Sequence, residues 1–173
     1  MIKNDKQLAY TKELAAKFEE TNQKLKANEE KRRLDPVGWQ LIQDSNQALR
    51  QKLISEVEEY EALEAHNPTQ PLVLEIDNIN YLPDVIIKAR IALKLTQQEL
   101  ALLSDHTEEE IKAFEEKNYH NASFLDFLAV SNALGIKIEN GKFIAHLDDF
   151  YQQELINIRS QVTSHTNLNP VWM

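Results

Sequence analysis

Two helix-capping signatures in close succession constrain the fold of this chain more than any other feature. Thr96 stands three residues before Glu99, and Thr107 stands three residues before Glu110, within the segment LTQQELALLSDHTEEEIKAFE at 95–115. In such a capping box, the hydroxyl and the carboxylate each accept a hydrogen bond from the backbone N–H of the other residue at the start of an α-helix. The segment therefore predicts two short helices joined by a tight turn.

The apolar residues of this segment fall where two helices crossing at a short turn would touch. They are Leu95, Leu100, Ala101, Ile111 and Phe114. The turn SDHT contains no glycine, so we expect Asp105 or His106 to take a left-handed conformation, which Asp tolerates better than most residues. Caps, spacing and apolar positions together predict helix-turn-helix geometry, although that geometry alone does not imply DNA binding.

The stretch ARIALKLTQQELALLSDHTEEEIKAFE, followed by FLAVSNALGI, resembles the XRE family of helix-turn-helix regulators. That family includes phage repressors and many antitoxins of toxin–antitoxin pairs. The resemblance covers residues 82–138, and the residues before it look like the helical N-terminal extension of a bacterial XRE subgroup. It implies a DNA-binding domain of the phage-repressor type that binds double-stranded DNA as a homodimer and represses by occupying its operator.

The resemblance also implies roles for single residues. Gln97, at the start of the first motif helix, would hold a backbone phosphate. Arg90 and Glu115 match the family's internal ion pair, although each could instead be a solvated charge. The base-reading positions fall at Glu108, Glu109, Lys112 and Ala113. The candidates for contacts to flanking phosphates are Lys88, Lys94, Lys112, Lys117, Asn118 and Tyr119, and for Tyr119 a packing role in its loop is equally open.

Glu108, Glu109 and Glu110 admit three interpretations. Acidic residues in the first turn of a helix interact favourably with its dipole, and Glu110 fits this role as the capping-box partner of Thr107. A carboxylate can also accept a hydrogen bond from cytosine N4 in the major groove, which makes Glu108 or Glu109 a base-reading candidate. In the third interpretation, this surface no longer reads DNA and instead meets a basic protein.

The charge balance argues against indiscriminate nucleic-acid binding. The net charge is −9, and residues 82–138 carry six basic and nine acidic side chains. Affinity for phosphates comes mostly from Lys and Arg, so specific base contacts and a dimer would have to compensate. The alternative function is an acidic protein-interaction module on the same scaffold, which binds and neutralises a basic protein such as a toxin.

The rest of the chain predicts a mainly α protein in four parts. Residues 1–66 indicate a long helical hairpin or coiled-coil extension, with helices over 5–30 and 36–65, unless they form a spacer without a partner. Residues 67–81 form a linker with a short strand, and the helix-turn-helix domain follows. Residues 139–173 predict a hairpin at Asn140-Gly141, a C-terminal amphipathic helix over 147–163 and a loose end. We thus expect a small β element near 72–77 and 136–146.

Several function classes find no support in the sequence. The chain has no cysteine, and its five histidines show no metal-ligand spacing. It contains no glycine-rich phosphate loop and no pair of carboxylates set apart as an acid and a base. No apolar run reaches the roughly 20 residues that span a bilayer, and MIKNDKQLAY has no apolar signal segment. We therefore expect a cytoplasmic protein that is not an enzyme and has no metal, cofactor or membrane partner.

Overall fold

The computed structural model describes residues 1–142 and 144–166, which are mainly α-helical. They divide into two compact units, one of residues 1–136 and one that begins at residue 137, each described by itself below. The hairpin and the helix-turn-helix block, which the sequence predicts as separate parts joined by the linker 67–81, belong to the same unit.

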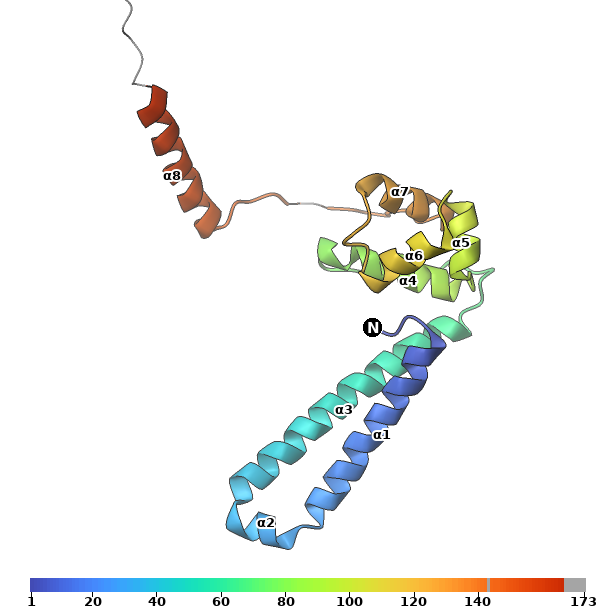
Figure 1. The fold of residues 1–173 in the computed structure, drawn as a ribbon, viewed down its shortest axis with the longest axis vertical. Helices are drawn as coiled ribbons and strands as arrows, with labels where there is room; N and C mark the ends of the chain where they lie inside the picture. The colour runs from blue at the N-terminus through green and yellow to red at the C-terminus, as the bar shows by residue number, and fades with distance from the viewer. Residues whose placement is uncertain (143, 167–173) are drawn as a thin grey trace, which may run out of the picture. The chain divides into compact units, whose positions relative to one another are not determined.

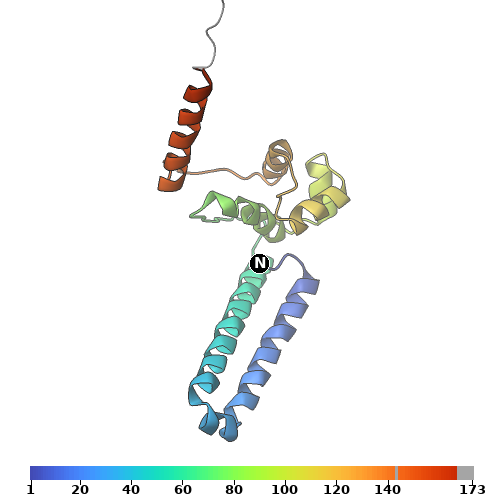
Figure 2. The same cartoon turned by 60° about the vertical axis from the view of Figure 1, so that its left-hand side comes forward.

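The first unit begins with a helical hairpin (Figure 1). Helix α1 (Asp5–Lys26) and helix α3 (Pro36–Ala65) run side by side in opposite directions, and the short helix α2 (Glu29–Leu34) lies at their connection in both views (Figures 1 and 2). Asn4, Asn28 and Asp35 cap the three helices by accepting backbone N–H groups. The predicted helix over 5–30 is thus interrupted at Ala27–Asn28.

Polar side chains are buried between the two long helices. Asn22 is 3% exposed and Gln43 is 7% exposed, and the amide of Asn22 donates to the Gln43 carbonyl oxygen at 3.2 Å. Near the connection, the Trp39 indole donates to the Leu25 carbonyl oxygen at 2.8 Å. These bonds fix the register of a hairpin whose apolar stripe is narrow.

The remainder of the unit is the helix-turn-helix block. After the single turn η1 (Ile79–Tyr81) come α4 (Leu82–Ala92), α5 (Gln97–Leu103), α6 (Glu108–Glu116) and α7 (Phe124–Ala133). One apolar core joins this block to the near end of the hairpin. It contains Ile2, Tyr60 and Leu63 from the hairpin together with Ile86, Ile87, Ala92, Leu100, Ile111 and Val130 from the block. Because the core is shared, the hairpin is a structural part of the block and not a loose extension.

The prediction of a small β element is wrong for the part of the chain that the structure describes. Residues 72–77 form no strand, and Leu72 packs against the helical core while Val73 is 80% exposed. In 136–146, Phe143 is outside the described residues and the others form no strand. Asn140 takes a φ of 61°, but no strand flanks Asn140-Gly141 among the described residues, so the predicted hairpin does not form there.

The second unit contains helix α8 (Asp149–Thr166), which extends past the predicted end at 163. Asp148 accepts the backbone N–H of Tyr151 at 3.0 Å at the start of this helix. The loose end predicted for the chain falls partly on 167–173, which lie outside the described residues.

Candidate nucleic-acid interface

Both motif helices begin with the capping boxes that the spacing indicated. The Thr96 backbone N–H donates to Glu99 Oε2 at 2.7 Å, and the Thr107 backbone N–H donates to Glu110 Oε2 at 2.8 Å. The two hydroxyls accept the N–H groups of the same glutamates, at 3.1 and 3.2 Å. These bonds lower the pKa of the Glu99 and Glu110 carboxyls, chiefly through the threonine backbone N–H groups.

The turn between α5 and α6 uses Asp105 as its left-handed residue. Asp105 has a φ of 58°, and the N–H of the next residue, His106, donates to the Ala101 carbonyl oxygen at 2.9 Å. The Ser104 hydroxyl donates to the Leu100 carbonyl oxygen at 2.7 Å. The carbonyl groups of Leu100 and Ala101, near the end of α5, therefore have hydrogen-bond partners without a glycine in the turn.

The two motif helices pack through the apolar positions that the sequence indicated. Leu100 and Ile111 are fully buried, and Ala101 and Phe114 are 2% and 7% exposed. The His106 ring meets the Phe114 ring edge-on, with centroids 5.7 Å apart. This packing fixes how α6 stands relative to α5.

Arg90 and Glu115 form a buried, two-atom ion pair between α4 and the end of α6. Arg90 Nε lies 2.5 Å from Glu115 Oε1, and Nη2 lies 2.8 Å from Oε2. Their side chains are 9% and 1% exposed. Arg90 Nη1 also donates to the Leu95 carbonyl oxygen at 3.0 Å, so the guanidinium ties the α4–α5 connection to α6.

Gln97 uses its side-chain amide inside the protein. Its Nε2 donates to Glu115 Oε2 at 2.8 Å, the same oxygen that Arg90 Nη2 contacts. The residue is partly exposed. Its predicted phosphate contact would therefore have to use the remaining N–H of that amide or exchange this bond for a phosphate.

The solvent-facing side of α6 carries the predicted base-reading positions. Glu109 and Lys112 are exposed, and Glu108 and Ala113 are partly exposed. Lys112 Nζ lies 2.6 Å from Glu108 Oε1, one helical turn away, and this hydrogen bond raises the pKa of Lys112. On this face, therefore, the lysine is partly neutralised by a glutamate of the same helix.

The loop after α6 contains three residues predicted to contact phosphates, and these residues differ in exposure. Lys117 is exposed, and the Asn118 side chain is partly buried and accepts a hydrogen bond from Lys3 Nζ at 2.5 Å. Tyr119 is only 5% exposed, and its ring packs against Phe114 and Phe127 at 5.7 and 6.0 Å. The side chain of Tyr119 thus has the packing role, and only its neighbours present side-chain atoms to solvent.

Two of the lysines predicted to contact phosphates instead bind residues of the hairpin. Lys88 forms an ion pair with Glu59, and Lys94 donates to the carbonyl oxygens of Leu63, at 3.3 Å, and Glu64. Lys3, which the sequence analysis did not single out, donates to the Glu115 carbonyl oxygen at the end of α6. No local pattern marks these contacts, because each joins residues about thirty or more positions apart.

The described residues show neither a metal site nor a membrane-spanning helix. They contain no group of three or more His, Asp or Glu side chains placed to hold a metal ion. Within the described ranges, no helix has both the length and the apolar character needed to cross a bilayer. Comparisons with protein-family models, curated proteins and solved structures give no match. What α6 can bind therefore has to be judged from its own side chains.

Proposed function

We propose that this chain is a sequence-specific, DNA-binding transcriptional regulator of the cytoplasm, which resembles XRE-family repressors and antitoxins. The exposed side of α6 would enter the major groove of double-stranded DNA, and a homodimer would occupy two half-sites. The observation that carries the proposal is the Arg90–Glu115–Gln97 cluster. It joins α4 and α6 through buried bonds and α5 through a part-buried one, and it leaves Glu109, Lys112 and Ala113 at least partly exposed.

A helix face held in this way suits base readout. Because the packing and the two capping boxes already order α5 and α6, little conformational entropy is lost when the face meets a ligand. Glu109 can accept a hydrogen bond from cytosine N4, and Ala113 can contact a thymine methyl group. Lys112 can turn from Glu108 to a base or a phosphate at small cost, because exposed ion pairs are weak.

The electrostatics make the proposed binding depend on sequence more than on charge. Lys88 and Lys94 are held at the hairpin, which leaves Lys112 and Lys117 as the exposed lysines of α6 and its following loop. With so few phosphate contacts per protomer, affinity for an arbitrary duplex should be low. Base contacts and the doubling of both lysines in a dimer would then provide the affinity for an operator.

The test of this proposal is selection from a pool of randomised duplexes by the full chain. We expect wild type to enrich a defined sequence and Glu109→Gln to enrich a different base at one position, with a discrimination of about 1–3 kcal/mol. Gln97→Ala should weaken binding to all sequences alike. The control is Glu58→Gln, which makes the same charge change on an exposed hairpin residue. Failure to enrich any sequence, or the same sequence for wild type and Glu109→Gln, would contradict the proposal.

A second function is favoured by the composition of α6. The helix carries five glutamates and one lysine, and Lys112 is paired with Glu108. Glu115 is buried against Arg90, but the other four glutamates are at least partly exposed and suit a basic protein partner, for example a toxin that the chain would neutralise. A fluorescent lysine-rich peptide distinguishes the two functions. Under this alternative the peptide binds at low salt and loses affinity when Glu109 is changed to Lys, whereas the duplex pool shows no enrichment.

A further inference from the structure

We propose that Lys3 is a positioning residue for the DNA-reading surface, because its ammonium group holds the end of α6 and the loop 117–119 in place. This inference rests on the proposed function and adds to it that the hairpin sets how the surface meets DNA. It concerns a residue far from the helix-turn-helix segment in sequence.

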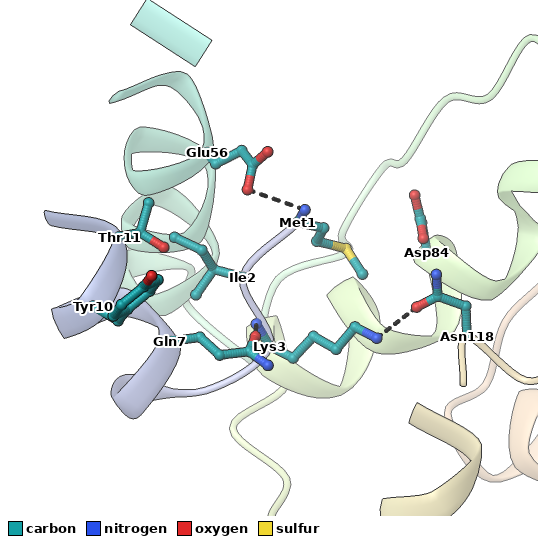
Figure 3. A pocket seen from close by; sticks show the side chains of 9 residues that line it. All are labelled: Met1, Ile2, Lys3, Gln7, Tyr10, Thr11, Glu56, Asp84 and Asn118. Atoms are coloured by element: carbon teal, nitrogen blue, oxygen red, sulfur yellow. Dashed lines mark hydrogen bonds and ion pairs between the residues drawn. The ribbon is translucent and has the colours of Figure 1, made fainter. Parts of the chain in front are cut away.

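The contacts of the Lys3 ammonium group lie at the end of the recognition helix. Nζ donates to the Glu115 carbonyl oxygen. It also donates, at 2.5 Å, to Asn118 Oδ1 (Figure 3). The last carbonyl groups of a helix lack partners within it, and a cation there interacts favourably with the helix dipole. Lys3 therefore provides for α6 what basic residues in a last turn commonly provide, while the last turn of α6 itself has none.

The backbone of Lys3 is fixed on several sides. The preceding residue, Ile2, is 3% exposed and belongs to the shared core. The Lys3 N–H donates to Gln7 Oε1 at 2.9 Å, and its carbonyl oxygen accepts from Arg90 Nη2 at 3.4 Å. Since Arg90 also binds Glu115, Lys3 is connected to the end of α6 through both its main chain and its side chain.

The Lys3 side chain is partly buried and lies near several carboxylates on its way to α6. The side chain crosses a cleft of about 430 Å³, bordered by Glu56, Asp84 and Asn118 (Figure 3). Burial lowers the pKa of Lys3, while the carboxylates of Glu115, Asp84 and Glu116 act in the opposite direction. A partly desolvated ammonium group forms stronger hydrogen bonds than one in bulk water.

The loop that Lys3 holds has a conformation that needs support. Asn118 and Tyr119 have φ values of 48° and 57°, and two successive left-handed residues other than glycine are costly. The Tyr119 ring is anchored in the core, whereas the side-chain hydrogen bond of Asn118 is to Lys3. Loss of the ammonium group should therefore loosen the segment that includes Lys117 and Asn118, which are the predicted phosphate contacts of this loop.

The experiment compares Lys3→Met with Lys6→Met in the full chain. Both changes remove one lysine charge, but Lys6 is exposed on the first turn of α1. By amide NMR, Lys3→Met should shift the signals of residues 117–119 and speed their hydrogen exchange about tenfold, which is the scale of one charge-assisted hydrogen bond. Affinity for the selected duplex should fall by a similar factor. Lys3→Arg should restore both properties, and Lys6→Met should change neither.

The outcomes separate this inference from the proposed function. If wild type binds the duplex and Lys3→Met binds it as well as Lys6→Met does, the positioning role is wrong while the function stands. Unchanged amide signals at 117–119 in Lys3→Met also overturn the role. If wild type selects no duplex, the function fails and the dependence of DNA binding on Lys3 fails with it.

Discussion

Arg90 holds the Glu115 carboxylate through two separate bonds, from Nε to Oε1 at 2.5 Å and from Nη2 to Oε2 at 2.8 Å. The carboxylate is almost fully buried, so it depends on these bonds and on the Gln97 amide for the solvation that it lost on folding. The pair is the point where three helices meet, and its removal should affect both stability and the outward face of α6.

Replacing only one partner of the Arg90–Glu115 pair should strongly destabilise the protein. Arg90→Met leaves a buried charge without its main partner, which should lower the free energy of unfolding by about 3–5 kcal/mol. Urea denaturation measures this loss. The double variant Arg90→Met, Glu115→Met removes both charges and should recover most of the stability. A single variant that loses less than about 1 kcal/mol would show that the carboxylate is solvated in some other way.

The capping box at α6 should contribute measurably to stability. Thr107→Ala removes the hydroxyl that accepts the Glu110 N–H, and the expected loss is about 1 kcal/mol. Thr107→Ser retains an acceptor at the same place and should lose only a small part of this. Thermal unfolding followed by circular dichroism compares the two variants, and equal losses in both would mean that the cap does not act through the hydroxyl.

The same cap predicts how stability depends on pH. The backbone N–H and hydroxyl of Thr107 lower the pKa of Glu110 below its ordinary value of 4.5. A carboxyl whose pKa is lowered by folding stabilises the protein fully above that ordinary value, and the contribution is lost as the pH falls through the lower value of the folded state. The melting temperature of wild type should thus decline between about pH 5 and pH 3 more steeply than that of Glu110→Gln. Parallel curves for the two proteins would contradict this prediction.

The left-handed turn residue offers a test of local strain. Asp105 has a φ of 58°, where glycine is unstrained and a β-branched residue is strongly disfavoured. Asp105→Val should cost about 1–2 kcal/mol, and Asp105→Gly should leave stability within about 1 kcal/mol of wild type. Chemical denaturation of the three proteins gives the order. A valine variant as stable as the glycine variant would mean that the turn can adopt another conformation.

The features that sequence analysis found correctly are local ones. The capping boxes join residues three positions apart. Because SDHT contains no glycine, the left-handed residue of the turn had to be Asp105 or His106, and it is Asp105. The capping residues, Thr96 and Thr107, could be identified because a helix start requires particular side chains at fixed positions. The Arg90–Glu115 pair joins more distant residues, and it was expected from family resemblance and not from any pattern within the chain.

The features that sequence analysis missed depend on packing between distant segments. The short β-type run LVLEI at 72–76 resembles a strand, but a strand needs a partner edge, and Leu72 packs against the helical core instead. In the sequence, Lys88 and Lys94 have no evident partner. In the fold, Glu59 and the carbonyl groups at the end of the hairpin lie beside them. Asn22 and Gln43 occupy buried positions that a search for apolar residues passes over.

The most direct test of the central claim, that the outward face of α6 reads DNA, is fluorescence anisotropy with two labelled duplexes. One duplex carries the region upstream of the gene for this chain, and the other carries the same bases in scrambled order. Titrations at several salt concentrations between about 50 and 200 mM should show tighter binding to the upstream duplex, with an affinity that falls as salt rises. Equal affinity for both duplexes, or no binding at the lowest salt, would contradict the claim and direct the search to a basic protein partner.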